Sequence, residues 1–596
     1  MAEPPLRDAR AGELGPADIG RPVRLAGWVD RRRDHGGIVF VDLRDASGLV
    51  QVVLDPGEHP GAEELRKEYC VAVAGEVRAR PEGTVNPDLV TGAVEVAVTS
   101  LRILSPAESL PFQLDERADV DEVRRLRYRY LDLRRPRMAA NLRARARMSR
   151  AIRRVLDGRD FLEVETPTLI RSTPEGARDL LVPSRHRQGA FYALPQSPQL
   201  FKQLLMVGGV ERYYQIARCY RDEDFRSDRQ VEFTQLDIEG SFWGREDVFE
   251  VLEAVIAEVV RDLRGVEVAT PFPRITHAAA MARYGTDKPD IRFGMEIADL
   301  GEVFAGTEFR AFAATLAEGG TVRGLNAGAA GLSRAGLDGL VEEARGLGAK
   351  GLVWLVVEDD GSLRSPVAKF IGETEKNLLT RALDAAPGDT LLIVADTARV
   401  AAEVLGRLRL RLGQPRGHDE LRFLWVIDFP VFDITPGGDL VPSHHPFTAP
   451  VDVTEMSEHP ERAIARAYDL VLNGSELGSG SVRIHDPSIQ RRVFEILGIS
   501  HETAERRFGW FLRALQYGTP PHAGFAVGLD RLLSILQGEP NIREVIPFPK
   551  TQTGADPLTE SPTPVEDFQL AELGLDLRPA VRAALAEEEA PGGDEG

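Results

Sequence analysis

The sequence predicts a multidomain α+β protein with a small antiparallel barrel, a strand-rich domain and an α/β domain inserted into the latter. Three observations support this fold class. Short alternating apolar runs crowd the N-terminal part, as in antiparallel strands. Strand-like runs return on both sides of a Gly- and Ala-rich stretch in which strand and helix patterns alternate. The chain has 596 residues, which is too long for one hydrophobic core.

The composition is typical of a globular enzyme. Hydrophobic residues make up 43% and charged residues 28%, and no apolar run reaches the roughly 20 residues that a membrane helix needs. Because the N-terminal segment lacks a signal-peptide pattern, we expect a cytoplasmic protein with no membrane partner. The net charge of -20 argues against nonspecific coating of nucleic acid, although a local basic patch can still bind it. Cys70 and Cys219 lie in apolar runs and are expected to be buried free thiols.

Residues 1–105 are predicted to form the barrel. Five runs predict strands, which is the number typical of an oligonucleotide-binding (OB) barrel: VRLAGWV, IVFVDLR, LVQVVLD, CVAVAGEVRA and AVEVAVTSLRIL. Arg31, Arg32 and Arg33 precede the strand that carries Phe40, and a basic loop beside an aromatic side chain suits unpaired bases. The alternative is a solvated arginine turn with Phe40 in the core.

Residues 106–137 are rich in Pro, Arg and acidic side chains and are predicted to be a hinge. The strand-rich domain then comprises residues 138–287 and 422–575, and the inserted domain spans 288–421. The acidic tail, 576–596, lacks aromatic residues and is expected to be disordered.

Two elements at the start of the strand-rich domain have clear local patterns. A helix is expected at about Met138 to Asp157, because five apolar residues recur at helical spacing: Met138, Leu142, Ala146, Ile152 and Leu156. A strand should follow from Phe161 to Thr166, which Pro167 must end or leave at a sheet edge.

Two arginines, Arg221 and Arg531, stand among carboxylates in strand-like surroundings. The chain has neither a Walker loop nor a Gly-x-Gly-x-x-Gly turn after a strand. These arginines are therefore the leading candidates to hold a phosphate chain, since guanidinium groups bind phosphate through paired hydrogen bonds.

Seven motifs occur in a fixed order: FLEVETPTL, STPEGARD, QSPQLFKQLLM, RDED with EFTQLD, SHHPFT, SGSVRIHD and GFAVGLDR. Their order resembles that of the bacterial aspartyl-tRNA synthetases of class II, and the barrel, hinge and insertion also follow that family's order. The resemblance covers nearly the whole chain. It implies an antiparallel catalytic sheet, a homodimer with FLEVETP near the contact, and ATP, L-aspartate and tRNA as substrates.

The resemblance implies that Arg221, Arg531 and Glu476 are catalytic, with Arg221 at the α-phosphate and Arg531 at the γ-phosphate end. Glu223, two residues after Arg221 on one strand face, would contact the adenine side. Asp469 and Glu476 would share one face if their segment is helical, and they offer oxygen ligands for Mg²⁺. The full ATP set implied is Arg221, Asp222, Glu223, Gln230, Glu476, Gly528, Leu529, Asp530 and Arg531.

For aspartate, the family's β-carboxylate clamp is matched by Lys202 and Arg483. His444 and His445 match a loop that closes over the substrate. The remaining contacts implied are Glu175, Ser197, Gln199 and Asp237. Asparagine would leave Lys202 and Arg483 partly unpaired in a desolvated pocket, so we expect free asparagine to be rejected.

In the barrel, the resemblance implies that Phe40 stacks on an anticodon base, that Gln51 reads its neighbours, and that Arg31 and the two arginines after it hold phosphates. His35 and Gly83 resemble the relaxed members of the family, which aspartylate tRNA-Asn as well as tRNA-Asp and so supply an amidotransferase. Alternatively, His35 merely fills a turn and the enzyme is strict for tRNA-Asp.

Two further alternatives are a catalytically silent RNA-binding paralogue and an asparaginyl enzyme. The presence of Arg221, Glu476, Arg483 and Arg531 speaks against the first. The insertion, together with the pair of Lys202 and Arg483, speaks against the second.

Overall fold

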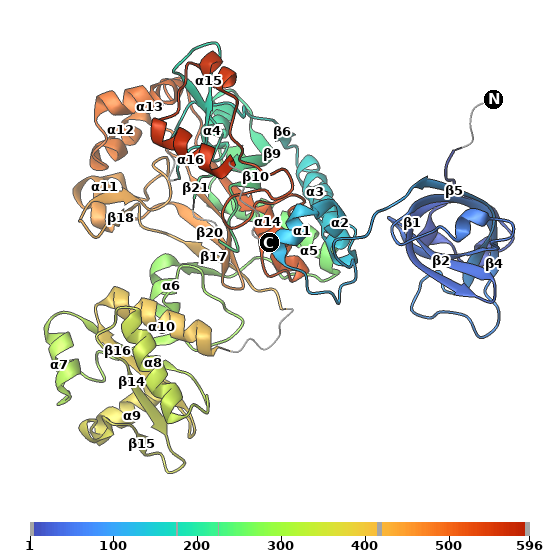
Figure 1. The fold of residues 1–596 in the computed structure, drawn as a ribbon. Helices are drawn as coiled ribbons and strands as arrows, with labels where there is room; N and C mark the ends of the chain where they lie inside the picture. Colours follow the sequence, from blue (N-terminus) through green and yellow to red (C-terminus); the bar gives the residue numbers. More distant parts are fainter. Residues whose placement is uncertain (1–4, 174–176, 224–225, 414–419, 590–596) are drawn as a thin grey trace. The chain divides into compact units, whose positions relative to one another are not determined.

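The computed structural model describes residues 5–173, 177–223, 226–413 and 420–589. They divide into two compact units, the first ending at Val120 and the second beginning at Asp121 (Figure 1). Among these residues, no helix is long and apolar enough to cross a membrane.

The first unit contains a closed barrel with the strand order β1, β2, β3, β5, β4, as the sequence predicts. Its strands are β1 Pro22–His35, β2 Ile38–Asp45, β3 Gly48–Leu54, β4 Cys70–Ala79 and β5 Val94–Ser105. Alternate apolar side chains such as Val23, Leu25 and Val29 fill its core. Gly36 and Gly37 turn β1 into β2 with φ of +60° and +83°, which glycine adopts without steric cost.

The second unit is built on one mixed sheet, in the order β11, β17, β20, β21, β22, β10, β9, β6. Its strands are β6 Leu162–Glu163, β9 Arg212–Tyr220, β10 Glu232–Ser241, β11 Arg274–Thr276, β17 Phe423–Ile427, β20 Ala467–Leu472, β21 Ser475–Val482 and β22 His522–Gly528. All neighbours are antiparallel except β11 with β17 and β6 with β9. The predicted strand before Pro167 is the short β6, which lies at the sheet edge.

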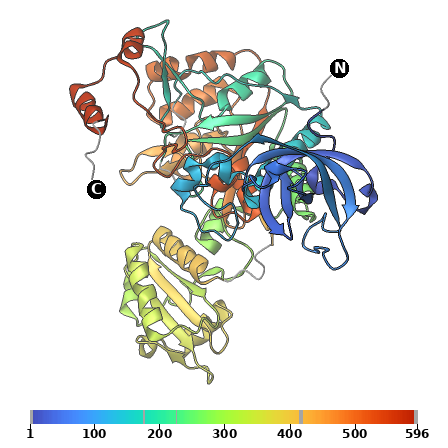
Figure 2. The same ribbon diagram turned by 45° about the vertical axis from the view of Figure 1, so that its right-hand side comes forward.

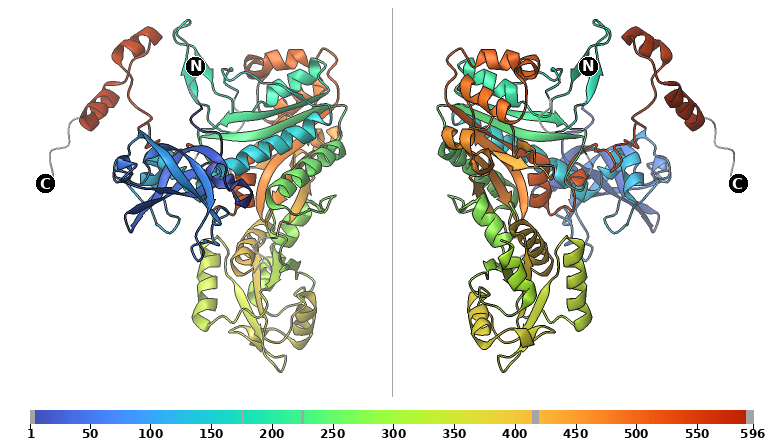
Figure 3. Two further views of the ribbon diagram at one scale, coloured as in Figure 1. Left: turned by 90° about the vertical axis from the view of Figure 1, so that its right-hand side faces the viewer. Right: turned by 90° about the vertical axis from the view of Figure 1, so that its left-hand side faces the viewer.

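Helices α3 Pro136–Asp157 and α5 Arg245–Arg264 lie together along one face of this sheet (Figure 3). The predicted helix is thus confirmed, and Met138, Ile152 and Leu156 are buried as expected, but the other two expected core positions are not. Ala146 is exposed and Leu142 only half-buried, while Asn141, Ala144 and Met148 are buried. Asn141 tolerates burial because its amide donates to Glu539 Oε1 at 2.7 Å and to the carbonyl oxygen of Glu544 at 3.1 Å.

The inserted domain has a sheet of its own, in the order β12, β13, β16, β14, β15. Its strands are β12 Ile297–Asp299, β13 Thr321–Asn326, β14 Val353–Val357, β15 Leu363–Arg364 and β16 Thr390–Asp396. Strands and helices alternate along the chain as predicted, although every strand pair is antiparallel. Helices α8 Arg334–Gly346 and α10 Ala398–Leu412 cover one face, and α7 Arg310–Ala317 and α9 Glu373–Ala382 the other (Figure 2).

The remaining elements surround the large sheet or lead into it. They are α1 Glu122–Arg127, α2 Arg129–Asp132, β7 Leu181–Pro183, β8 Phe191–Ala193, α4 Gln199–Val207, α6 His277–Tyr284, β18 Phe432–Ile434, β19 Leu440–Pro442, α11 Val453–Glu458, α12 Pro487–Ile496, α13 His501–Ala514, α14 Leu529–Gln537 and α15 Asp567–Leu573. The tail differs from the disorder expected, since Pro579–Glu589 forms helix α16, from which Arg582 pairs with Asp567 and Asp576. Residues 590–596 lie outside the described part.

Candidate active site

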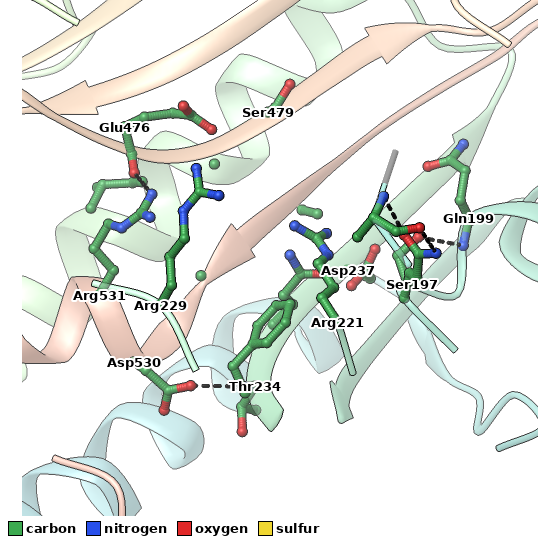
Figure 4. A pocket seen from close by; sticks show the side chains of 18 of the residues that line it. Ser197, Gln199, Arg221, Arg229, Thr234, Asp237, Glu476, Ser479, Asp530 and Arg531 are labelled. Carbon is green, nitrogen blue, oxygen red and sulfur yellow. Dashed lines mark hydrogen bonds between the residues drawn. The ribbon is translucent and has the colours of Figure 1, made fainter. Parts of the chain in front are cut away.

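A cavity of about 620 Å³ lies over the middle of the large sheet. Most of the predicted ATP and aspartate residues line it: Ser197, Gln199, Lys202, Arg221, Glu223, Gln230, Asp237, His444, His445, Glu476, Arg483, Gly528, Asp530 and Arg531. Arg229 and Arg531 lie toward one end, and Ser197 and Gln199 toward the other (Figure 4). The cavity is therefore long, with arginines at one end and small polar groups at the other.

Three predicted residues are placed differently, and a fourth is not among the described residues. Leu529 is packed in the hydrophobic core, because its side chain is on the inner face of α14. Asp222 pairs with Arg178 at 3.5 Å and does not line the cavity. Asp469 lines a neighbouring cavity instead. Glu175 lies outside the described residues.

Two local premises of the sequence reasoning were also wrong. Asp469 and Glu476 are not on a helix, because β20 and β21 form a hairpin and place one carboxylate on each strand. Glu223 does not share a strand face with Arg221, because β9 ends at Tyr220. Arg221 and Glu223 nevertheless line the same cavity.

Strand β10 supplies the floor of the cavity. Its neighbours in the sheet are β9 and β22, and alternate residues Phe233, Gln235, Asp237 and Glu239 share one side. The guanidinium carbon of Arg221 lies 5.0 Å from the centre of the Phe233 ring, a cation-π geometry. The sequence reasoning missed Phe233 and Glu239, although the alternation from Asp237 would have identified both.

At the end of the cavity that is predicted to bind aspartate, two cations and two carboxylates form a buried network. Lys202 Nζ lies 3.1 Å from Asp237 Oδ1 and 3.3 Å from Glu239 Oε2. Arg483 donates to both carboxylate oxygens of Glu239, from Nε at 2.9 Å and from Nη2 at 3.2 Å. Glu239 needs the absence of a side chain at Gly524, where a Cβ would lie 1.8 Å from Oε2. Glu239 thus fixes both cations in place.

The pKa values of the two carboxyl groups are shifted in opposite directions. Burial raises the pKa of Asp237, against the attraction of Lys202. Burial also opposes ionisation of Glu239, but Arg483 and Lys202 outweigh it and lower the pKa of that carboxyl. Asp237 Oδ2 and Gln199 Nε2 are buried and have no hydrogen-bond partner among the described residues. A buried acceptor and a buried donor are thus available to a zwitterionic ligand.

The two histidines of the predicted loop lie in opposite electrostatic surroundings. Burial and the charge of Arg483 hold the pKa of His445 well below its usual value, and Arg483 Nη1 lies 2.7 Å from His445 Nε2. Burial also disfavours the charged form of His444, but Asp469, whose Oδ1 is 3.0 Å from Nε2, raises its pKa. His445 is therefore neutral at pH 7 and can accept the Arg483 hydrogen bond.

We expect the burial of His445 to make the stability of the protein depend on pH. Below pH 6.5 His445 takes up a proton more readily in the unfolded chain than in the native protein. Its burial therefore costs no stability above pH 6.5 and lowers the free energy of unfolding as the pH falls. The melting temperature should drop between pH 7.5 and pH 5.5, and the drop should be smaller in His445→Gln. Equal drops in the two proteins would contradict this assignment.

The other end of the cavity carries cations whose carboxylate partners are at least partly exposed. Arg531 Nη2 lies 3.0 Å from Asp228 Oδ2, its Nη1 donates to the carbonyl oxygen of Glu476, and Arg229 pairs with Glu223 at 2.6 Å. Asp530 has a structural task, accepting from Arg145 at 2.5 Å and from the backbone NH of Thr234 at 2.8 Å. Gln230 accepts from the backbone NH of Lys550 at 2.9 Å.

A divalent cation could be held by Asp469 and Glu476. Burial and the nearby Asp469 charge raise the pKa of Glu476, and a cation would relieve this repulsion. Within the described ranges no three metal-ligating side chains gather at one place. Mg²⁺ characteristically binds one or two carboxylates and completes its shell with phosphates and water, so the residues fit that ion better than a metal caged by protein.

The barrel carries a polar network on its outer face. Phe40 is half-buried there, between the buried Val39 and Val41, so the alternative that placed Phe40 in the core does not hold. Arg33 donates to Asp42 Oδ1 at 2.6 Å and to Gln51 Oε1 at 3.3 Å. Figure 1 shows these strands in blue.

The other predicted barrel residues occupy different depths. Gln51 is buried and donates to Glu95 Oε2 at 2.7 Å, so it is held in one orientation. Arg31, His35 and Gly83 are exposed. Gly83 has φ of +80° with open space around its Cα, so a larger residue there would be strained by its backbone and not by its neighbours.

Two family models match the chain. The model described as tRNA synthetases class II (D, K and N) matches residues 121–552, and the OB-fold nucleic acid binding domain matches residues 23–104. These ranges coincide with the unit that holds the cavity and with the barrel.

Curated relatives match over almost the full length. The aspartate-tRNA(Asp/Asn) ligase of Moorella thermoacetica is 55% identical over 580 residues, which cover 96% of either chain. A ligase of the same name from Rubrobacter xylanophilus is 53% identical over 584 residues, covering 96% of this chain and 97% of that protein.

A solved structure shares the fold. The asparaginyl-tRNA synthetase from Pyrococcus horikoshii complexed with asparaginyl-adenylate has a TM-score of 0.56 at 19% identity, over 91% of this chain and 98% of that one. The family model over residues 121–552 and the curated relatives show that the chain belongs to the class II tRNA synthetases (D, K and N).

Proposed function

We propose that the chain is an aspartate-tRNA ligase that activates L-aspartate with ATP and transfers it to tRNA-Asp and tRNA-Asn. The observation that carries the amino acid assignment is the pair of buried cations, Lys202 and Arg483, held on Glu239 at one end of the cavity. The names of the curated relatives support the choice of tRNA.

In the activation step, an α-carboxylate oxygen of aspartate attacks the α-phosphorus of ATP. The bond to the diphosphate breaks on the opposite side, and negative charge accumulates on the phosphate oxygens. Arg221 neutralises that charge at the α-phosphate, while Arg229 and Arg531 bind the β- and γ-phosphates. The ring of Phe233, beneath Arg221, offers a stacking surface for adenine.

Aspartate recognition uses the buried end. Arg483 and Lys202 bind the β-carboxylate, whereas Asp237 Oδ2 accepts from the substrate ammonium group. Ser197 and Gln199 hold the α-carboxylate, as Gln199 Nε2 is free among the described groups. Glu175 belongs to the same proposed set. His444 and His445 close the site, and asparagine is rejected because its amide cannot satisfy both cations.

The magnesium ion, when bound through Asp469 and Glu476, supplies charge neutralisation at the phosphates of ATP. In the second step the terminal ribose hydroxyl of tRNA attacks the aspartyl carbonyl, and the departing phosphate of AMP accepts the proton. Phe40, Gln51 and Arg31 are the proposed anticodon contacts.

Aspartate-dependent ATP/diphosphate exchange tests the first step, and charging of tRNA-Asp and tRNA-Asn transcripts with labelled aspartate tests the second. Exchange that requires aspartate and not asparagine, with charging of both transcripts, supports the proposal. A folded protein without exchange would favour the silent paralogue, and charging of tRNA-Asp alone would favour the strict enzyme.

His35 provides a sharper test of tRNA choice. His35→Leu should lower kcat/KM for tRNA-Asn by about tenfold while charging of tRNA-Asp changes little, since one anticodon contact is worth about 1–3 kcal/mol. The matched control is His59→Leu, because His59 contacts the Val98 carbonyl oxygen of the same barrel. An equal loss of kcat/KM for tRNA-Asp and tRNA-Asn would indicate that His35 only fills its turn and does not select the tRNA.

A homodimer and a cytoplasmic location complete the proposal. Leu162 and Leu169, on the FLEVETPTL segment, are 56% and 52% exposed, and β6 leaves one edge of the sheet unpaired. An exposed apolar sheet edge is a suitable contact for a second copy. Aspartylated tRNA-Asn needs conversion by an amidotransferase, which would be an indirect partner.

A further inference from the structure

A second cavity, of about 460 Å³, adjoins the arginine end of the first. We call it the rear cavity. It shares Asp228, Arg229, Glu476, Arg531 and Ile542 with the first cavity. Its own wall adds Lys288, from the segment that leads into the inserted domain, and Gly474, from the turn between β20 and β21. The rear cavity therefore begins where the proposed γ-phosphate contact ends.

Lys288 is held at this wall by contacts on both sides of its segment. Two residues further on, Asp290 is buried against the β20–β21 turn, where a Cβ on Gly474 would lie 3.3 Å from the Asp290 Cβ. The carbonyl oxygen of Asp290 accepts from Arg409 Nη2 at 2.8 Å. The backbone NH of Lys288 donates to Thr286 Oγ1 at 3.2 Å.

The three cations of the rear cavity have partners that a stronger anion can replace. Arg531 lies 3.0 Å from Asp228, Arg229 2.6 Å from Glu223, and Lys288 3.5 Å from Asp287. These carboxylate side chains are between 28% and 51% exposed. Exposed ion pairs contribute little to stability because water screens them, so displacing them costs little.

The chemistry of activation supplies such an anion. As the bond between the aspartyl oxygen and the α-phosphorus forms, the bond from that phosphorus to the bridging oxygen breaks. Its electron pair stays on the diphosphate, which leaves with several negative charges and moves away from the α-phosphate. Arg229 and Arg531 border both cavities, so they can stay in contact with it along this path.

We propose that the rear cavity receives the inorganic diphosphate released on activation and that Lys288 is one of its ligands. This rests on the proposed function and extends it by giving the root of the inserted domain a part in product binding. Substrate ATP is held by Arg221, Arg229 and Arg531, whereas Lys288 contacts the diphosphate after the bond has broken.

ATP/diphosphate exchange at saturating ATP and aspartate, with diphosphate varied, tests the proposal. Lys288→Met should raise KM for diphosphate about tenfold, as expected for the loss of one cation-phosphate contact, with KM for aspartate unchanged. Lys288→Arg keeps the positive charge, so its KM for diphosphate should stay close to that of the wild type. The matched control is Lys350→Met, since Lys350 makes the same kind of lysine-carboxylate pair, 3.5 Å from Glu318, on the inserted domain.

Calorimetry can measure how inorganic diphosphate binds to the wild type and to Lys288→Met. This measurement needs no catalysis, so it is independent of the test of the proposed function. About tenfold weaker binding by the variant is expected. Equal binding, or an unchanged KM for diphosphate, would overturn the proposal. An equal rise in KM for ATP and for diphosphate would overturn it too, because Lys288 would then contact ATP itself.

Discussion

Replacing Arg483 by lysine is expected to lower kcat/KM for aspartate in ATP/diphosphate exchange by about 10²–10⁴-fold, or roughly 3–5 kcal/mol. The guanidinium fork donates to both oxygens of Glu239 and, from Nη1, to Ser481 Oγ at 2.7 Å. Lysine keeps the charge but cannot make these bonds at once. Glu239 would then lose part of its compensation in a fully buried site.

The expected loss should appear in aspartate binding and not in ATP binding. Arg44→Lys is a matched control, because Arg44 makes a two-pronged contact with Glu68 Oε1 and Oε2, at 2.8 and 2.7 Å, in the barrel. It should leave exchange unchanged, as exchange involves no tRNA. A loss below tenfold in Arg483→Lys, at an unaltered melting temperature, would mean that the fork is not the aspartate contact.

The second large effect is expected at Arg221. Arg221→Lys should reduce kcat of exchange by about 10²–10³-fold, the size seen when one group that stabilises transition-state charge is lost. The aspartate dissociation constant should change little, because Lys202 and Arg483 remain in place. The planar contact with Phe233 would be lost along with the second NH group.

Rapid-quench measurement of adenylate formation separates this chemical step from product release. Arg212→Lys is the matched control, since Arg212 starts β9, the strand that Arg221 directly follows, and donates to the carbonyl oxygen of Arg159 at 2.7 Å. If Arg221→Lys weakened ATP binding without slowing adenylate formation, Arg221 would act in binding alone.

Much of the fold follows from local patterns in the sequence. The barrel strands are predicted because apolar and polar residues alternate in runs such as VRLAGWV, and this alternation indicates which side chains point inward. A helix at about Met138 to Asp157 is predicted from apolar residues at helical spacing, but its full buried face is not, since Asn141 is buried in an amide contact with Glu539, which is remote in the chain. Local spacing cannot show such a partner.

The site shows the same division. Arg221, Lys202, Arg483 and Arg531 could be selected from motifs, and they do line one cavity. The role of Glu239 in joining two of these cations depends on the pairing of β10 with β22, which brings Glu239 opposite Gly524. The seven-residue spacing in AYDLVLNGSELG suits a helix, whereas Asn473 and Gly474, with φ of +52° and +84°, turn the segment into a hairpin.

The order of the strands has a consequence for biosynthesis. Strand β10 borders β22, which follows it by nearly half the chain, and Lys202 on α4 donates to the carbonyl oxygen of Phe525 on β22. Ribosomes extend a chain at about 5–20 residues per second, so β10 must wait unpaired on that side while the inserted domain is made. The barrel can close long before this. A nascent chain cut short ahead of His522 would therefore keep a folded barrel but lack β22, the strand that pairs with β10 at the floor of the cavity.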